Sequence, residues 1–362
     1  MTFLLSINFI ESDKFYQGEY YYLLLSSLLG ALVVSSSRDL LTIFIGIELA
    51  STPMFLLSGW KKGDRKSNEG AIKFFLLGVL SASLILYGFS LIYGLTGQLV
   101  FADISAYLLA NSLGSSPVLL LSAILVISGI GFKISVVPFH SWAPDTYEGA
   151  PLPITAYLSV SSKATGFVAL IVLLTKVFES SGQSWGVILA IVAGATMTLG
   201  NLVALQQTNP VRLLAYSSIS QAGFIIAPLA VSGITGNYQD GIFASVTYLI
   251  IYAFMNIGAF LSVHLFTNFT KSDNFYEWGG IAKHSPLTGV LTTVFFFSLA
   301  GIPPLGGWFA KFVVFRSLLS TGEIIGISLA IVGAINAVIA LVYYARISKV
   351  IWMDELKNPE EE

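Results

Sequence analysis

Five charged side chains lie inside long apolar stretches of the sequence: Glu48, Lys73, Lys133, Lys163 and Lys311. A charge at the centre of a bilayer costs roughly 2.5–3.5 kcal/mol even on a lenient scale, so such a group normally faces a partner or a water-filled path. A buried lysine whose desolvation is balanced by a nearby carboxylate can exchange a proton near neutral pH. These residues therefore predict proton or ion movement through a membrane.

Lys133 lies beside a predicted break in a membrane helix. Pro138 removes a backbone donor and clashes with the preceding turn, so the helix should end before it. Broken membrane helices are tolerated only where protein or a wet cavity satisfies the freed backbone groups. His140 follows the break, where a neutral imidazole can pass protons or cap the loop. Four more residues should shape the re-entrant turn and its cytoplasmic mouth: Trp142, Asp145, Tyr147 and Glu148.

Lys163 and Lys311 are two further candidate proton carriers. Lys163 lies about 15 Å into its predicted helix, counting 1.5 Å per residue from Pro153, which is too deep to reach the interface comfortably. Lys311 lies just past GIPPLGG (301–307), which we interpret as the break of a second discontinuous helix. A structural role for these lysines is the alternative. Small polar residues that can hold water or close helix contacts surround Lys163 in sequence: Ser159, Ser161, Ser162 and Thr165.

Glu48 and Lys73 form a possible ion pair between adjacent antiparallel helices. Glu48 falls near the middle of its span, where carboxylates are rare and usually functional. Lys73 opens the next predicted span and can alternatively extend its ammonium to the interface. The predicted boundaries place Lys73 shallower than Glu48, but the pair comes within reach if that helix begins near Ser67.

The composition excludes several classes of function. The chain has no cysteine, which rules out disulfides, thiolate-held iron–sulfur clusters and cysteine-ligated zinc. Its three histidines lack ligand spacing, and no basic cluster suggests nucleic acid. We therefore expect no metal, no cofactor and no redox chemistry in this chain alone.

Hydrophobic residues make up 55% of the chain and charged residues 10%, against about a quarter charged in ordinary soluble proteins. Apolar segments of about 20 residues separated by short polar loops are typical of helical membrane proteins. We predict an all-α polytopic membrane protein with about ten spans, at 20–37, 39–59, 70–94, 117–137, 153–178, 185–206, 212–232, 240–266, 287–320 and 323–351.

The spans fall into two blocks of five, 20–178 and 185–351, flanked by an N-terminal segment 1–19 and a tail 352–362. The fourth span of each block is broken and carries a lysine, Lys133 or Lys311. Because five is odd, the two blocks cross the membrane in opposite directions. This arrangement is typical of the inverted repeats of transporters, whose sites lie at discontinuous helices.

Basic residues in short loops predict the orientation. The loop 60–66 carries four of them, which places it in the cytoplasm, together with both ends of the chain. Most other loop lysines and arginines then lie on the same side. The opposite side keeps only Arg38, Lys176 and Arg316.

Three motifs resemble the antiporter-like membrane subunits of respiratory complex I. They are GIGFKISVVPFHSWAPDTYEGAP (129–151), NPVRLLAYSSI (209–219) and LAGIPPLGGWFAK (299–311). Lysine rather than glutamate at 163 and 311 favours the subunit N type, called subunit 2 in mitochondria. The resemblance covers nearly the whole chain, but it implies that the family's first three helices and its last helix are missing here.

The resemblance implies a role for each buried charge. Glu48 would be the glutamate of the family's fifth helix and Lys73 its partner on the sixth. Lys133, Lys163 and Lys311 would be the lysines of helices seven, eight and twelve, in a hydrated axis that moves protons while quinone is reduced elsewhere. It also implies partners: other membrane subunits of complex I, including a neighbouring antiporter-like subunit. NADH, FMN, iron–sulfur clusters and quinone would bind elsewhere in that complex.

We therefore predict a proton-translocating membrane subunit of an NADH:quinone oxidoreductase in a bacterial inner membrane. A subunit of a multi-subunit Na⁺/H⁺ antiporter, or of a photosynthetic or hydrogenase-linked relative of complex I, is the alternative. A structural membrane scaffold is the third hypothesis, and it predicts that neutralising Lys163 and Lys311 leaves activity intact.

Overall fold

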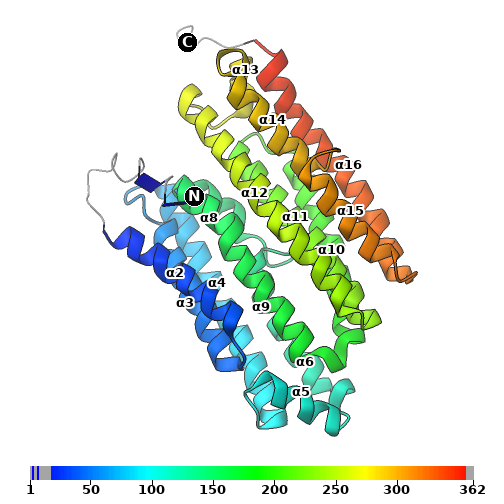
Figure 1. Cartoon of the computed structure of the whole chain (residues 1–362). Helices are drawn as coiled ribbons and strands as arrows, with labels where there is room; N and C mark the ends of the chain where they lie inside the picture. The colour runs from blue at the N-terminus through cyan, green and yellow to red at the C-terminus, as the bar shows by residue number, and fades with distance from the viewer. Residues whose placement is uncertain (1, 4–5, 8–17, 356–362) are drawn as a thin grey trace. The chain divides into compact units, whose positions relative to one another are not determined.

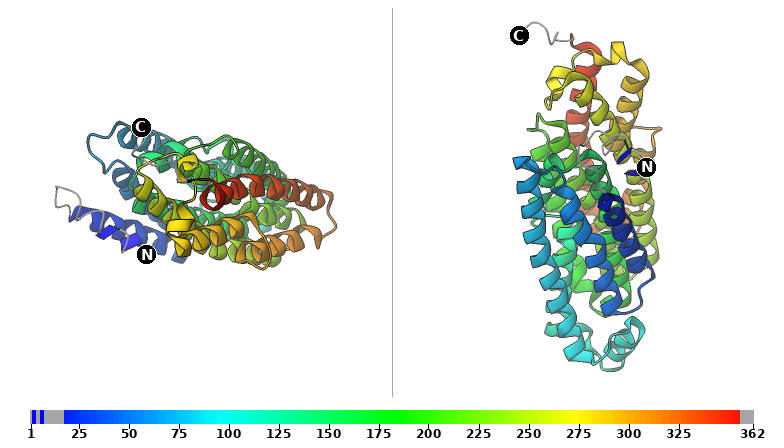
Figure 2. Two further views of the ribbon diagram at one scale, coloured as in Figure 1. Left: turned by 90° about the horizontal axis from the view of Figure 1, so that it is seen from above. Right: turned by 90° about the vertical axis from the view of Figure 1, so that its left-hand side faces the viewer.

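The computed structural model describes residues 2–3, 6–7 and 18–355 (Figures 1 and 2). In these residues the secondary structure is helical, and an isolated antiparallel bridge joins Asp39 to Val100. The predicted segment 1–19 and tail 352–362 lie in large part outside the described residues. The principal helices are α2 Glu19–Ser36, α3 Leu40–Ser58, α4 Arg65–Thr96, α5 Phe101–Ala110, α6 Pro117–Ile134, α7 Trp142–Gly149, α8 Leu152–Tyr157, α9 Lys163–Lys176, α10 Gly182–Ala204, α11 Pro210–Thr235, α12 Tyr238–Thr270, α13 Ile281–His284, α14 Pro286–Ala300, α15 Gly306–Leu319 and α16 Ile324–Met353.

Within the described residues, nine helical segments are long and apolar enough to cross a membrane. They match nine of the ten predicted spans, and the remaining one, 287–320, corresponds to the broken pair α14 and α15. The main difference in bounds is α4, which begins at Arg65 rather than 70, so Lys73 lies inside the helix and does not open it. The short helices α5 and α7 were not predicted. The all-α polytopic fold is confirmed.

Two compact units divide the chain: residues 1–189 with 229–239, and residues 190–228 with 240–362. In the first unit α2 packs along α3 (Figure 1), and α4 packs against both α6 and α7. Asp39 begins α3 by accepting hydrogen bonds from the backbone and hydroxyl of Thr42. Burial raises the pKa of Asp39, but these bonds and one from the backbone of Leu41 outweigh it and hold the pKa below its usual value.

In the second unit α14 and α15 pack against α16, as Figure 1 shows for α14. Buried polar side chains tie α16 to α10: Asn201 donates to the Asn336 side chain at 3.0 Å, and Tyr343 donates to Asn201 at 3.0 Å. The Arg346 guanidinium donates to the Leu205 carbonyl at the end of α10. The inverted-repeat relation between the two predicted blocks stays a prediction.

Both predicted helix breaks are confirmed. α6 ends at Ile134, and Ser135 adopts the left-handed conformation with φ 59° before the chain turns into α7. α14 ends at Ala300, and Gly301 is left-handed with φ 93° before α15 begins. A left-handed residue directly after a helix lets later N–H groups reach its last carbonyls. Each break therefore ends one helix without leaving all of its terminal carbonyls unpaired.

Candidate functional site

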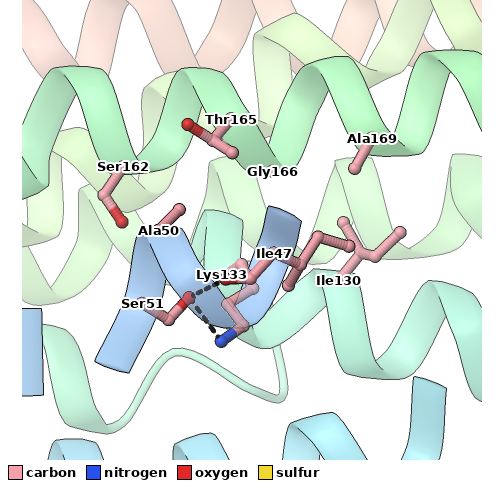
Figure 3. Close-up of a pocket in the computed structure, with 9 residues that line it drawn as sticks. All are labelled: Ile47, Ala50, Ser51, Ile130, Lys133, Ser162, Thr165, Gly166 and Ala169. Atoms are coloured by element: carbon pink, nitrogen blue, oxygen red, sulfur yellow. Dashed lines mark hydrogen bonds between the residues drawn. The ribbon is translucent and has the colours of Figure 1, made fainter. Parts of the chain in front are cut away.

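Lys133 forms the centre of the charge cluster in the first unit. Its side chain is 6% exposed, and its ammonium donates to the Ser51 hydroxyl at 2.7 Å (Figure 3). The Glu48 carboxylate lies 3.6 Å from the same nitrogen. Ser51 donates its own proton to the Ile47 carbonyl, so it presents a lone pair to Lys133. The ammonium is thus shared between a neutral acceptor and a charged one.

The local structure explains why these groups meet. Glu48 and Ser51 are three residues apart on α3 and therefore share a face of that helix. Lys133 lies in the last turn of α6, where the carbonyl end of the helix favours a cation. The Phe55 and Phe132 rings lie 5.5 and 5.9 Å from the ammonium and exclude water from part of its surface. Residues of α3 and α6 therefore provide both the burial of Lys133 and its charged partner.

A cavity of about 10 Å³ adjoins Lys133 between α3, α6 and the α8–α9 segment (Figure 3). Roughly 10–15 Å³ is the smallest space that holds one water. Hydroxyls from two sides line it, from Ser51 and from Ser162 and Thr165, so it has polar partners for such a water. Its full lining is Ile47, Ala50, Ser51, Ile130, Lys133, Ser162, Thr165, Gly166 and Ala169.

Lys163 is buried, with 1% of its surface exposed, as its predicted depth required. It begins α9 directly after a π-helical turn, Leu158–Ser162, which separates α9 from α8. Such turns occur often at functional sites. The structure thus brings Glu48, Lys133, Lys163 and His140 into one unit of the chain.

Lys311 belongs to the second unit and is 4% exposed. Its ammonium donates to the Ala300 carbonyl at 2.6 Å and to the Leu299 carbonyl at 3.2 Å, the last two of α14. The Phe224 ring lies 5.1 Å away. Terminal carbonyls of a helix lack intrahelical donors and carry partial negative charge, so they form a cation site. The two carbonyls at the end of α14 therefore bind Lys311, which follows the break in the sequence.

The predicted Glu48–Lys73 ion pair is wrong in this structure. Lys73 pairs instead with Glu69 at 2.7 Å and with Asp145 at 2.6 Å, and 43% of its side chain is exposed. Glu69 and Lys73 are four residues apart on α4 and share a face, against which α7 packs. Helix α7 thus brings Asp145 to Lys73, while Glu48 lies beside Lys133.

Sequence reasoning missed three groups that contact the lysines: Ser51, Asp145 and the terminal carbonyls of α14. Serines are frequent in membrane helices, and a carbonyl has no signature in a sequence, so neither could be singled out. Asp145 was assigned to the turn, but its partner depended on how α7 packs. Among the described residues no three His, Cys, Asp or Glu side chains could hold a metal ion, and the prediction that this chain binds no cofactor stays a prediction.

Comparison with known proteins identifies the family. Residues 37–338 match the family described as the membrane part of NADH:quinone oxidoreductase and the Mrp antiporter. The chain belongs to this family. It is an integral membrane protein, and the resemblance that the three motifs indicated is confirmed.

Individual relatives agree. The chain is 42% identical to NADH-quinone oxidoreductase subunit N 2 of Rhizobium meliloti, covering 98% of this chain and 72% of that protein. It is 40% identical to NADH-quinone oxidoreductase subunit N of Moorella thermoacetica, over 100% of this chain and 73% of the relative. It is also 40% identical to NAD(P)H-quinone oxidoreductase subunit 2 of Synechocystis, 68% of which it covers.

Solved structures show the same fold. A chain of respiratory complex I from Thermus thermophilus matches with a TM-score of 0.76 and 31% identity, covering 96% of this chain and 73% of that one. A chain of an archaeal membrane-bound sulfane sulfur reductase matches with a TM-score of 0.82 and 26% identity, covering 94% and 69%. A chain of the Mrp complex from Dietzia matches with a TM-score of 0.84, 94% and 62% coverage, and 23% identity, so it supports the fold alone.

Proposed function

We propose that this chain is a proton-translocating membrane subunit, of the subunit N type, in an NADH:quinone oxidoreductase. The observation that carries the proposal is the buried Lys133 ammonium, held at a helix break between Ser51 and Glu48. Ser51 is the nearer acceptor and is neutral, and the charged acceptor, Glu48, lies farther away at 3.6 Å. Two acceptors of different charge allow its proton affinity to change with small movements of Glu48.

The mechanism follows from Coulomb's law at short range. Interaction of two unit charges at about 4 Å is worth roughly 4 kcal/mol near a protein surface, and falls as they separate. When Glu48 approaches Lys133 the ammonium is favoured, and when it withdraws the proton can leave. Lys163 is the next carrier in the same unit, and Lys311 is a third carrier in the second unit.

The partners in this proposal are the other membrane subunits of the complex, including a neighbouring antiporter-like subunit. Quinone reduction by NADH through FMN and iron–sulfur clusters takes place elsewhere in it, and no cofactor binds to this chain. We place the complex in a bacterial inner membrane, with both ends of this chain in the cytoplasm. The names of the relatives, from subunit N to the complex I structure, support the assignment to complex I.

A subunit of a cation/proton antiporter is the second candidate. The matched family includes the Mrp antiporter, and the structural match to the Mrp complex is close, although it shows the fold alone. The two candidates differ in what drives transport. Sodium-dependent proton exchange in vesicles without NADH would favour the antiporter, whereas pumping that requires NADH and quinone favours the oxidoreductase.

The test is proton uptake and NADH:quinone activity in inverted membrane vesicles carrying Lys133→Ala in the assembled complex. We expect both rates to fall by roughly a hundredfold, the low end of the effect of losing a proton-transfer group. Lys176→Ala is the matched control, because Lys176 is an exposed lysine at the end of α9. Normal pumping by an assembled Lys133→Ala complex would refute the proposal.

A further inference from the structure

The Leu299 carbonyl at the end of α14 accepts hydrogen bonds from two different helices. Lys311 on α15 donates to it at 3.2 Å, and the side-chain amide of Gln221 on α11 donates to it at 3.2 Å. A carbonyl oxygen has two lone pairs and can accept both. The neighbouring Ala300 carbonyl accepts from Lys311 at 2.6 Å. The oxygen that helps to hold Lys311 is therefore shared with a neutral donor.

The orientation of the Gln221 amide is fixed by its other partner. Its oxygen accepts the hydroxyl of Tyr248 on α12, and both side chains are buried, with 1% or less exposed. A carbonyl cannot donate, so only the amide nitrogen of Gln221 can face Leu299. Tyr344 on α16 is also hydrogen-bonded to Gln221, and it is bonded in turn to Ser217, one turn earlier on α11. Three helices thus hold this amide in one position.

This arrangement matters when Lys311 changes charge. Hydrogen bonds from an ammonium are roughly twice as strong as neutral ones, so the hold of Lys311 on the two carbonyls weakens when it releases a proton. A buried carbonyl left without a donor is destabilising. Gln221 carries no charge and donates to Leu299 whether or not Lys311 is protonated. The helix end therefore keeps a donor in both states.

We propose that Gln221 is a positioning residue for Lys311: it holds and satisfies the Leu299 carbonyl, so that Lys311 can release its proton without disturbing the break between α14 and α15. The inference rests on the proposed function, in which Lys311 carries protons. The titratable groups around the site are the buried hydroxyls of Tyr248, Tyr343 and Tyr344, and within the part of the chain that the structure describes Lys311 forms no ion pair.

The test is the pH dependence of NADH-driven proton uptake by inverted vesicles that contain the assembled complex. Gln221→Met keeps the length of the side chain and removes the amide. Leu299 then depends on Lys311 alone, which penalises the neutral amine and favours the ammonium. We expect slower pumping at neutral pH, and a shift of the alkaline limb to higher pH by about one unit, the worth of one hydrogen bond.

Ser262→Ala is the matched control, since it removes a buried hydrogen bond within α12, from the Ser262 hydroxyl to the Gly258 carbonyl, and leaves both α14 carbonyls and the Gln221 amide untouched. It should keep the wild-type pH profile. Tyr248→Phe is a second variant that frees the Gln221 amide without removing it, and should shift the profile in the same direction by a smaller amount. It decides the question if Gln221→Met does not assemble.

An assembled Gln221→Met complex with a wild-type pH profile would overturn the inference, as would an equal shift in Ser262→Ala. If Tyr248→Phe has to stand in, an unshifted profile overturns it too. Lys311→Met separates this from failure of the proposed function. Full pumping by Lys311→Met refutes the role of Lys311 and the positioning role with it. Loss of pumping in Lys311→Met beside an unshifted Gln221→Met refutes the positioning role alone.

Discussion

At Lys133 a neutral hydroxyl, rather than a second carboxylate, accepts the shorter hydrogen bond from the ammonium. Ser51 stabilises the ammonium at 2.7 Å without adding charge, which leaves Glu48 at 3.6 Å as the variable partner. A second fixed carboxylate would hold the proton too firmly for transfer. The neutral acceptor therefore holds Lys133 in place, and the proposed mechanism varies only the distance to its charged partner.

This role predicts the effect of Ser51→Ala. Hydrogen bonds to charged groups contribute about 1.5–3 kcal/mol, so losing this one should change the proton affinity of Lys133 by roughly tenfold or more. We expect pumping in assembled complexes to fall by a similar factor. Ser83→Ala is the control: Ser83 and Ser51 each donate to the carbonyl four residues back, but Ser83 is exposed and contacts no lysine. Equal pumping by the two variants would show that the Ser51 contact is dispensable.

The sequence predicted five charges at membrane depth, because a lysine or glutamate inside an apolar run is costly wherever it points. Lys133, Lys163 and Lys311 are buried as expected, whereas 29% of the Glu48 side chain and 43% of the Lys73 side chain are exposed. It did not predict partners correctly, because a partner depends on which face of one helix meets another. Which partner Lys73 meets depends on how α4 is rotated about its own axis, and in the structure Lys73 meets Asp145. On a lipid-exposed helix, the apolar periodicity of the sequence does not fix that rotation.

At the level of elements, small residues bring α7 against α4. A Cβ added at Gly70 would lie 2.8 Å from the Asp145 carbonyl and 3.0 Å from the Thr146 Cα. The Thr146 hydroxyl donates to the Gly70 carbonyl at 3.1 Å. The ion pairs Lys73–Asp145 and Lys66–Glu148 join the same two helices. Helix α7, which follows the break near Lys133, is thus attached to α4 by close backbone contact and by charge.

Gly70→Ala and Gly94→Ala, both on α4, test this attachment. Gly94 has no neighbour within 4 Å of an added Cβ, so alanine there should stabilise the helix by about 0.5–1 kcal/mol. Alanine at Gly70 must displace α7 and should cost about 1–3 kcal/mol. Thermal denaturation of the purified complex, monitored through the release of this subunit, measures the stability change of each variant. A stabilising Gly70→Ala would mean that α7 moves away from α4 without cost.

Proline and glycine made both helix breaks predictable, since their backbone constraints act whatever the surroundings. The positions of α5 and α7 could not be predicted in the same way. Both are short, and their helical form depends on packing: in α5, Phe101, Ile104 and Leu108 are buried on one face. The π-helical turn before Lys163 likewise has no proline or glycine to mark it.

For the whole molecule, the orientation in the membrane is the prediction that most needs a direct test. The chain has no cysteine, so a single introduced cysteine can be labelled without background. We expect Lys62→Cys, in the loop before α4, to react with an impermeant thiol reagent from the cytoplasmic side. Gln98→Cys, in the loop after α4, should react only from the opposite side. The reverse pattern would invert the proposed topology, and with it the direction of proton movement.

The overall fold was predictable because the bilayer imposes segment length and apolar composition on every span. Nine of the predicted spans have counterparts among the described helices that meet both criteria. The division into two blocks of five spans stays a prediction. The compact units group residues by contact, and residues 229–239, at the end of α11 and the start of α12, group with the first unit. Spatial grouping depends on contacts between distant segments, which spacing along the chain does not encode.

The π-helical turn at Leu158–Ser162 sets the direction of Lys163 by chain length rather than by residue type. A π turn contains one more residue than the α-helical turn it replaces, and each residue of an α-helix turns the chain by about 100°. Helices α8 and α9 therefore present faces that a continuous helix would not align. Deleting any one residue of this turn would rotate Lys163 by about that angle relative to α8, with the chemistry of the lysine unchanged.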